Sequence, residues 1–447
     1  MNLFRLLHAY IQTKQAMGIR SRRSLEARQQ RLLTRHFQWV LKHSRFYRRT
    51  FADAIADWDE AVVTFERLEK LPLLDKETMM AHFDELNTVG IRKEEAFRIA
   101  TQAEESRDFT PNIGKVTVGL SSGTSGNRGL FLVSAKERER WAGVILAKVL
   151  PRGLQSKESV AFFLRANSNL YTTVQQRRLT FQYYDLFHPL SAHVERLNQQ
   201  QPTILLAPPA MLLFLSHEKK EGRLQIDPIK VVSIADVLDD RDRETIAAQF
   251  GQPIHQIYQC TEGFLAATCS HGTLHLNEDL VHIGREWIDR DSGRFVPIVT
   301  DFSRTIQPIV RYRLNDVLVE KKEPCPCGSV FTAIERVEGR CDDIFYLKER
   351  KVQATRAVFP DLIRRAVWQA GERVLQYRVV QQASNVITVA FQECRGSDRR
   401  EAEDRIRAAF FQLFERLDVQ PAMIRFTPYQ APVLHKKMRR VERMWSP

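Results

Sequence analysis

Short runs of β-forming residues alternate with helical runs between about residue 110 and residue 340. The apolar runs have the length and composition of buried strands, and they lie at 116–120, 130–133, 160–164, 204–207 and 231–234. Helical patterns at 210–218 and 241–250 separate the later runs. Because parallel neighbours in a sheet need a crossover connection, usually a helix, this alternation predicts an α/β fold with mixed, mostly parallel sheets covered by helices.

The first 50 residues have the periodicity of helices. Mostly apolar positions recur at spacings of three and four residues, namely Leu25, Gln29, Leu32, Leu33, His36, Phe37, Val40 and Leu41. The opposite side carries Arg20, Arg22, Arg23, Arg28, Arg31 and Arg35. A membrane-binding or RNA-binding face would carry such charge. A helix packed on a core with a solvated basic side is the commoner arrangement, and we expect that one.

The pattern changes again after residue 340. A helix is expected at 356–370, a strand pair at 374–381 and 386–391, a long charged helix at 398–417 and a last strand at 422–427. A stretch of about 100 residues with its own strands and helices can form a separate α+β domain. We therefore predict a large N-terminal domain at 1–340, with 1–50 as its helical lead-in, and a small C-terminal domain at 341–447.

The charge balance restricts the partners only in part. There are 67 Lys and Arg against 54 Asp and Glu, a net charge of +13, which suits nucleic acid, an anionic membrane or phosphorylated substrates. The sequence has no helix-turn-helix or RNA-binding signature, so no nucleic-acid partner is expected. It has no evident secretory signal, and its most apolar internal run, 141–150, is too short to cross a bilayer. We expect a cytoplasmic protein without a transmembrane segment, and a homodimer is left open.

A loop rich in hydroxyls and glycines follows the first predicted strand. It runs Ser121, Ser122, Gly123, Thr124, Ser125, Gly126, Asn127, Arg128 and Gly129. Glycines let backbone N–H groups turn toward an anion, the hydroxyls donate further hydrogen bonds, and Arg128 adds a positive charge. The sequence lacks the Gly-Lys-Ser/Thr ending of a Walker A loop. By itself the loop is equally well explained as a plain turn between strands.

Two further motifs have side chains that suit a nucleotide. Tyr258, Thr261 and Glu262 follow the apolar segment 254–257, where an aromatic ring can stack on a base and a carboxylate can hold Mg²⁺. Asp316 ends the run 308–316, and its carboxylate can accept hydrogen bonds from ribose hydroxyls. Each motif has a plainer explanation, which for 308–316 is a β-hairpin with a surface ion pair.

The order of these motifs along the chain resembles the core motif series of the adenylate-forming superfamily. The series continues with Gly339-Arg340-Cys341-Asp342-Asp343 and a lysine near the C-terminus. The closer resemblance is to the phenylacetate–CoA ligase-like branch, with its F390-synthetase-related members. It extends from about residue 30 to the end, and it implies a large adenylation domain followed by a small, mobile C-terminal domain.

The resemblance also implies roles for individual residues of the large domain. The hydroxyl–glycine loop would fold over the β- and γ-phosphates of ATP. Arg128 stands near the place where many relatives carry a lysine. Tyr258 would flank the adenine, Thr261 would touch the α-phosphate, and Glu262 would bind Mg²⁺. The residues expected at the phosphates are Ser121, Ser122, Gly123, Thr124, Ser125 and Gly126.

For the end of the chain, the resemblance implies a ribose contact, a hinge and a catalytic lysine. Asp316 would bind the ribose. Asp342 would be the hinge, with Arg340 just before it. Lys437 lies three residues before Arg440-Val441, as the catalytic lysine of relatives does, and Lys436 remains the alternative. A cation there would offset the repulsion between the substrate carboxylate and the α-phosphate.

Cysteines and histidines predict a metal site. Cys325 and Cys327 form a close pair, and Cys269 lies upstream beside His271 and His275. Three thiolates and one imidazole suit a closed, tetrahedral structural Zn²⁺ site. Some phenylacetate–CoA ligase-like proteins carry a similar set, in which His275 matches the ligand and His271 is the alternative. The plainer explanation is a set of ordinary free thiols and imidazoles.

The resemblance therefore implies an acid–thiol ligase. ATP would activate a carboxylic acid, aromatic or fatty, as an acyl-adenylate with release of pyrophosphate. The acyl group would then pass to a thiol on CoA or a carrier protein. ATP, Mg²⁺, CoA and a structural Zn²⁺ would be the cofactors. Two alternatives stay open at this point, namely adenylyl transfer to a hydroxyl acceptor and a non-enzymatic, zinc-stabilised binder of nucleic acid or membranes.

Overall fold

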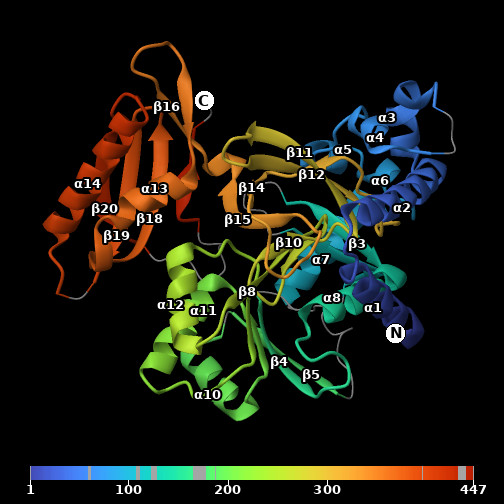
Figure 1. Cartoon of the computed structure of the whole chain (residues 1–447), viewed down its shortest axis with the longest axis horizontal. Coiled ribbons are helices and arrows are strands. Elements are labelled where there is room, and N and C mark those ends of the chain that lie inside the picture. Colours follow the sequence, from blue (N-terminus) through green and yellow to red (C-terminus); the bar gives the residue numbers. More distant parts are fainter. Residues whose placement is uncertain are drawn as a thin grey trace. The chain divides into compact units, whose positions relative to one another are not determined.

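The computed structural model describes residues 2–58, 62–106, 111–121, 128–164, 178–186, 188–394, 396–430 and 439–445. The chain forms two compact units (Figure 1). The larger unit comprises Met1–Leu314 and Val319–Arg336, and the smaller comprises Asn315–Leu318 and Val337–Pro447. The predicted domain boundary at residue 340 and the hinge near Asp342 stay predictions. Among the described residues, no helix is both long and apolar enough to span a membrane.

The larger unit begins with helices. They are α1 (Leu3–Met17), α2 (Arg22–His43), α3 (Arg45–Ile55), α4 (Phe65–Glu69), α5 (Lys76–Ala81), α6 (Phe83–Leu86) and α7 (Lys93–Ser106). The predicted helical lead-in is therefore broken into separate helices. Ser44 makes one of these breaks, since it ends α2 and its Oγ accepts a hydrogen bond from Tyr47 N, which caps α3. The buried face of α2 contains Leu25, Gln29, Leu33, His36, Phe37 and Val40.

The main sheet of the described chain has the strand order β11-β12-β14-β15-β10-β9-β8-β7-β6-β4-β5, and β13 pairs with β12. The segment β5-β4-β6-β7-β8 is parallel, and β8-β9, β9-β10, β10-β15 and β11-β12 are antiparallel. The bounds are β4 (Glu158–Leu164), β5 (Leu179–Asp185), β6 (Ile204–Ala207), β7 (Lys230–Ser233), β8 (Ile254–Cys260), β9 (Gly263–Thr268), β10 (Leu274–Leu276), β11 (Val281–Asp289), β12 (Arg294–Asp301), β13 (Tyr312–Arg313), β14 (Asp316–Glu320) and β15 (Ala333–Arg340).

Helices cover both faces of the parallel segment, because its side chains alternate between two cores. Phe163 and Leu205 pack among residues of α10 (Leu190–Gln200), α11 (Pro209–Lys220) and α12 (Asp240–Phe250). Phe162 and Leu206 point to the other face and pack among residues of α1 and α8 (Ala135–Val149). This arrangement confirms the predicted α/β fold, with a mixed sheet whose first half is parallel.

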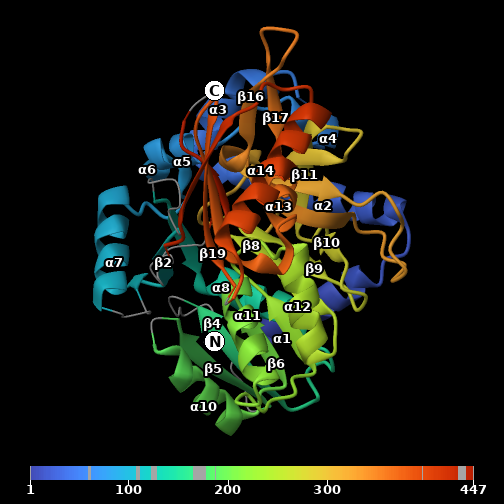
Figure 2. The same cartoon turned by 90° about the vertical axis from the view of Figure 1, so that its left-hand side faces the viewer.

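A small antiparallel sheet precedes the main sheet in sequence. It consists of β1 (Asn112–Ile113), β2 (Val116–Leu120) and β3 (Leu130–Ser134). It packs against α7, where Ala96 and Ala100 meet Val118, Leu130 and Leu132 in one apolar cluster (Figure 2). The two predicted strands on either side of the hydroxyl–glycine loop are thus neighbours, and the loop connects them.

The smaller unit is an α+β fold. It contains the sheet β20-β19-β18-β21, the hairpin β16-β17 and the helices α13 and α14 around one core that includes Phe345, Phe391 and Phe410. The bounds are β16 (Phe345–Lys348), β17 (Thr355–Val358), α13 (Pro360–Trp368), β18 (Val374–Ala383), β19 (Val386–Glu393), α14 (Arg399–Arg416), β20 (Met423–Pro428) and β21 (Val441–Arg443).

The helix predicted at 356–370 was wrong at its start. Residues Thr355–Val358 form β17, which pairs with β16, and the helix begins only at Pro360. Proline is well suited to the first helical position and disfavours a helical conformation in the residue before it. Phe359, the residue before it, is accordingly extended, with φ −75° and ψ 151°.

Candidate active site and metal cluster

The stem of the hydroxyl–glycine loop is a closed hairpin. Leu120 of β2 pairs with Leu130 of β3. Beyond this pair, Ser121 N donates to Gly129 O at 2.7 Å, and Gly129 N donates to Ser121 Oγ at 2.8 Å. The predicted phosphate-binding residues Ser122, Gly123, Thr124, Ser125 and Gly126 lie outside the described residues. The structure therefore describes the two ends of the loop. Phosphate binding by the loop stays a prediction.

Arg128 lies on the exposed side of this stem. Its Nη2 forms an ion pair of 2.6 Å with Glu104 of α7, and both side chains are 40% exposed. Its Nε also approaches the carbonyl oxygen of Ser121 at 3.5 Å. In this structure the guanidinium thus pairs with a protein carboxylate, and a contact with the phosphates stays a prediction.

The second motif forms a tight turn between β8 and β9. Cys260 pairs with Gly263, so Thr261 and Glu262 are the two residues of the hairpin loop. Tyr258 lies in β8 opposite Ala266. Tyr258, Thr261 and Glu262 are the residues predicted to contact adenine, the α-phosphate and Mg²⁺. The turn therefore places all three where β8 ends and β9 begins.

Glu262 is a buried carboxylate with a phenol beside it. Its exposed fraction is 9%, and the hydroxyl of Tyr312 donates a hydrogen bond to it. Burial and the nearby negative charge of Glu262 both raise the pKa of Tyr312. The tyrosine therefore stays protonated and remains a donor to Glu262. A buried carboxylate oxygen with one donor has lone pairs left for a cation.

Arg304 connects the loop stem to this turn. Its Nη1 donates to the carbonyl oxygen of Thr261 at 3.3 Å, and its Nη2 donates to that of Leu132 in β3 at 3.1 Å. One guanidinium thus spans the strand that leaves the hydroxyl–glycine loop and the turn that carries Glu262. A planar group with fixed donors holds two acceptors at a defined separation.

Gln307, three residues after Arg304, also binds strand β3. Its Oε1 accepts from Leu132 N at 2.8 Å, and its Nε2 donates to Leu130 O at 3.1 Å, so its amide pairs with β3 as a neighbouring strand would. Gln307 is buried. The carboxylate of Glu137 in α8 in turn accepts hydrogen bonds from the backbone N–H groups of Thr305 and Ile306.

Sequence reasoning missed Arg304 and Gln307. They lie between β12 and the predicted motif 308–316, in a segment with no regular secondary structure. Their only local signal is that two polar side chains lie beside the apolar Phe302 and Ile306 in the sequence. This pattern does not indicate a functional site unless the tertiary contacts are known.

The smaller unit brings the predicted ribose and hinge residues together. Asn315 Nδ2 donates to Asp342 Oδ2 at 2.5 Å, and Cys341 N donates to Asn315 O at 2.9 Å. Asp316 follows as the first residue of β14, and Arg340 is the last residue of β15. The turn at Asp342 is therefore tied to the start of β14 within this unit.

The chain near the predicted catalytic lysine is attached at the same turn. Lys436 and Lys437 lie outside the described residues. Arg439, two residues after Lys437, forms an ion pair with Asp343. Burial raises the pKa of Asp343, and the guanidinium of Arg439 acts in the opposite direction. The described part of the C-terminal segment is thus anchored next to Asp342.

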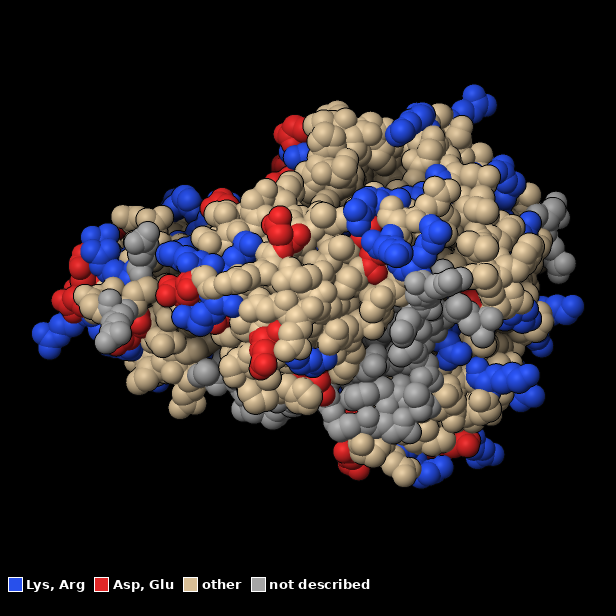
Figure 3. All heavy atoms as spheres, turned by 90° about the horizontal axis from the view of Figure 1, so that it is seen from below, with Lys and Arg blue, Asp and Glu red and all other residues tan. Residues whose placement is uncertain are grey.

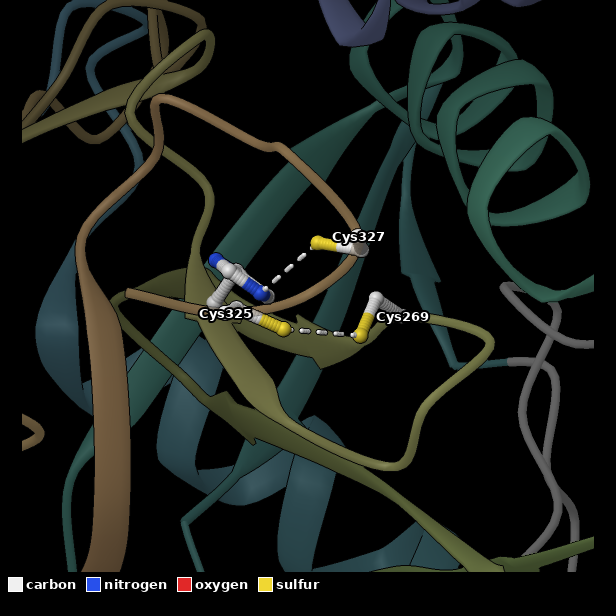
Figure 4. Close-up of side chains that lie close together, drawn as sticks. Cys269, Cys325 and Cys327 are labelled. Atoms are coloured by element: carbon white, nitrogen blue, oxygen red, sulfur yellow. Dashed lines mark hydrogen bonds between the residues drawn. The ribbon is translucent and has the colours of Figure 1, made fainter. Parts of the chain in front are cut away.

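Three cysteines and one histidine of the larger unit meet in a compact cluster (Figure 4). The ligand atoms of Cys269, His275, Cys325 and Cys327 all lie within 4.8 Å of one another. Cys269 Sγ is 3.7 Å from Cys325 Sγ, and Cys327 Sγ is 3.5 Å from His275 Nε2. With usual bond lengths, a tetrahedral zinc site needs S···S edges of about 3.8 Å and N···S edges of about 3.6 Å. The geometry therefore fits a tetrahedral metal ion.

The surroundings of the cluster favour His275 over His271 as a ligand. His275 is buried, and its Nδ1 lies 2.9 Å from the carbonyl oxygen of Phe331. A carbonyl oxygen only accepts, so Nδ1 carries the proton and Nε2 offers its lone pair toward Cys327. His271 is exposed and lies outside the cluster. All four thiol and imidazole groups predicted from the sequence are thus brought together.

Comparison of the sequence with protein-family models and with curated proteins finds no match. Solved structures do match. A 2-hydroxyisobutyryl-CoA ligase in the postadenylation state, in complex with 2-HIB-AMP, superposes with a TM-score of 0.69 at 17% identity, over 94% of this chain and 89% of that chain. The open conformation of the same ligase, in complex with 2-HIB-AMP and CoA, gives 0.60 at 16% identity, over 95% and 91%.

More distant ligases have the same fold. The amide bond synthetase McbA from Marinactinospora thermotolerans matches with a TM-score of 0.53 at 15% identity, over 71% of this chain and 67% of that chain. These identities are low, so the likeness concerns the fold. The predicted adenylate-forming fold is thereby confirmed, and the phenylacetate–CoA ligase-like branch stays a prediction.

Proposed function

We propose that this chain, whose fold is that of adenylate-forming ligases, uses ATP to activate a carboxylic acid as an acyl-adenylate. The observation that carries the proposal is the link that Arg304 makes between the stem of the hydroxyl–glycine loop and the turn of Thr261 and Glu262. It supports the proposal because it fixes the distance between the stem of the predicted phosphate-binding loop and the turn with the buried carboxylate, as a reaction between a nucleotide and a bound acid requires.

In this proposal each nucleotide motif of the chain contacts one part of ATP. The loop residues Ser122–Gly126 bind the β- and γ-phosphates through N–H and hydroxyl groups. Tyr258 flanks the adenine, and Thr261 donates to the α-phosphate. Glu262 binds Mg²⁺, which its burial and its oxygen ligands suit. Asp316 binds the ribose hydroxyls.

The smaller unit supplies the catalytic cation. The carboxylate of the acid attacks the α-phosphorus, a new C–O–P linkage forms, and pyrophosphate leaves with the electron pair of the broken P–O bond. Lys437 donates to oxygens of both reactants and offsets their repulsion, a contribution whose loss typically costs about 10²–10³ in rate. Arg439, two residues after Lys437, forms an ion pair with Asp343. We propose that the smaller unit turns about the hinge near Asp342, with Arg340 beside it.

The second half-reaction transfers the acyl group to a thiol. CoA or a carrier-protein thiolate attacks the acyl carbonyl carbon, a thioester forms, and AMP leaves. The solved CoA ligase in complex with 2-HIB-AMP and CoA supports CoA as the acceptor. An aromatic or fatty acid is our proposal for the substrate.

The Cys₃His cluster is proposed to bind a structural Zn²⁺. Its four ligands fill a tetrahedral shell, so no position is left for a substrate or water. It joins the turn after β9, β10 and the Cys325–Cys327 loop. The ion would therefore hold these segments of the antiparallel part of the sheet together without taking part in the reaction.

The proposal is tested by acid-dependent exchange between ATP and labelled pyrophosphate over a panel of aromatic and fatty acids. At least one acid should support exchange. Glu262→Gln and Lys437→Ala should each lower it by about 10²-fold or more, whereas Glu105→Gln, at an exposed site, should leave it unchanged. Lys436→Ala, measured in parallel, distinguishes the two candidate lysines. No exchange with any acid would contradict the proposal.

The acceptor is tested with the best acid of that panel. Addition of CoA should convert the bound acyl-adenylate to acyl-CoA with release of AMP, which mass spectrometry detects. Formation of an adenylylated hydroxyl compound instead would contradict a thiol acceptor and favour the adenylyl-transfer alternative. A preparation without exchange that binds RNA with steep salt dependence would favour the non-enzymatic alternative.

A further inference from the structure

Helix α1 buries mostly small residues and exposes most of its large apolar residues. The buried residues are Leu6, Ala9, Thr13 and Ala16. The exposed fractions are 77% for Phe4, 52% for Ile11, 51% for Leu3 and 38% for Leu7. An amphipathic helix on a core ordinarily has the opposite arrangement. Scattered exposed apolar residues are common, but four on one short helix form a contiguous patch of the kind that marks an interaction surface.

The orientation of α1 is determined by close packing on α8. A Cβ atom on Gly143 of α8 would lie 2.3 Å from the carbonyl oxygen of Leu6, so the two helix backbones nearly touch. Arg5 adds an ion pair of 3.1 Å to Glu139 of α8. A helix held this tightly cannot turn its large side chains inward. The close contact with α8 therefore keeps the apolar face of α1 exposed.

The segment that carries this face has charged side chains of one sign. Residues 2–25 contain no Asp or Glu, but they contain the basic residues Arg5, Lys14, Arg20, Arg22 and Arg23. Arg5 and Arg22 are ion-paired, whereas Lys14, Arg20 and Arg23 have no carboxylate within 4.0 Å in the described part of the chain. Figure 3 shows that blue side chains prevail over red ones at the right of the view, the end of the larger unit where Figure 1 places α1 and α2.

We propose that the exposed face of α1, formed by Leu3, Phe4, Leu7 and Ile11, inserts into the headgroup region of an anionic lipid bilayer. An apolar stripe on a helix without acidic residues, followed by a basic segment, is the pattern of a helix that lies in the membrane interface. A second copy of the chain suits the face less well. A twofold pairing of α1 with α1 would bring basic residues together with no acidic partner in 2–25.

Vesicle co-sedimentation tests this proposal with the whole chain. Vesicles of phosphatidylcholine with about 30% phosphatidylserine serve as the probe, and vesicles of phosphatidylcholine alone serve as the neutral comparison, to which binding should be weaker because the attraction between the basic residues and the anionic lipid is lost. The wild-type protein should bind the anionic vesicles, and binding should weaken with added salt. The double substitution Phe4→Ser, Ile11→Ser should weaken binding about tenfold or more, because both side chains would no longer insert.

A matched control separates insertion from general hydrophobicity. Leu375 and Met423, 57% and 56% exposed, lie in the smaller unit, and Leu375→Ser, Met423→Ser should leave vesicle binding unchanged. Equal binding by the wild type and the α1 variant would overturn the proposal, and so would failure of the wild type to bind. A wild-type dimer in light scattering that the α1 substitutions convert to a monomer would also overturn it in favour of self-association. None of these outcomes depends on the proposed ligase activity.

Discussion

Arg304 Nη1 donates a hydrogen bond of 3.3 Å to the carbonyl oxygen of Thr261. The two residues are 43 positions apart in the sequence, and Thr261 immediately precedes the buried Glu262. The other terminal nitrogen of the same guanidinium binds Leu132 O in β3. Arg304 is therefore the described side chain that joins the two motifs on which the proposed nucleotide site depends.

We predict that Arg304→Ala lowers acid-dependent pyrophosphate exchange about tenfold or more, because the Thr261 turn and the loop stem lose their common donor. The two freed carbonyl oxygens also lower the free energy of unfolding by about 1–3 kcal/mol. Exchange is therefore measured well below the melting temperature. Arg290→Ala, at an exposed arginine of the same unit, is the control and should match the wild type. Normal exchange in Arg304→Ala would refute a positioning role.

The metal cluster offers a matched pair of histidine substitutions. Purified protein should contain about one equivalent of zinc by mass spectrometry of the element. His275→Gln should lose the metal and lower the melting temperature, because His275 Nε2 faces Cys327 in the cluster. His271→Gln should change neither quantity, since His271 is exposed and lies outside the cluster. Metal retained in His275→Gln and lost in His271→Gln would reverse the assignment.

Buried histidines predict a loss of stability at acid pH. Burial, with a contribution from Arg140, lowers the pKa of His36 to about 3, and burial, with nearby arginines, lowers that of His282 to about 4. Both folded values lie below the unfolded value of about 6.5, so the unfolded chain binds more protons between these limits. Stability is therefore full above about pH 6.5 and falls as the pH decreases.

The expected size of this effect is about 2 kcal/mol for His36 between pH 7 and pH 5. Urea unfolding at the two pH values measures it. His36→Leu should reduce the difference in unfolding free energy between the two pH values, whereas His217→Gln, at an exposed histidine, should leave it as in the wild type. An undiminished difference in His36→Leu would show that His36 does not contribute.

The contact between α1 and α8 predicts an unusual response to alanine. Gly→Ala inside a helix ordinarily stabilises by about 1 kcal/mol. Gly143→Ala should instead destabilise, since the new Cβ would lie 2.3 Å from Leu6 O and α1 would have to move. Gly284→Ala is the control, because its Cβ would make an ordinary contact of 3.5 Å with Ile298. Thermal unfolding compares the two, and a stabilised Gly143→Ala would contradict the close packing.

The sequence by itself determined the elements whose signals are local. The strands predicted at 116–120 and 204–207 have the same bounds in the structure, because β-forming apolar residues that alternate in the first run and are continuous in the second are local signatures of a strand. The sequence also predicted that Cys325 and Cys327 bind the same metal ion, because they are only two positions apart. The helix at 356–370 failed at its start, because Pro360 and pairing with β16 outweighed helical periodicity.

Tertiary structure decided the relationships between distant segments. The pairing of β10 with β15 places His275 rather than His271 among the cysteines, and the chain path after β12 places Arg304 between β3 and Thr261. The choice of which face of α1 is buried depends on Gly143 in another helix. In all three cases the residues in contact are more than 40 positions apart in the sequence. Local periodicity therefore does not encode them, whereas packing and hydrogen bonding in three dimensions do.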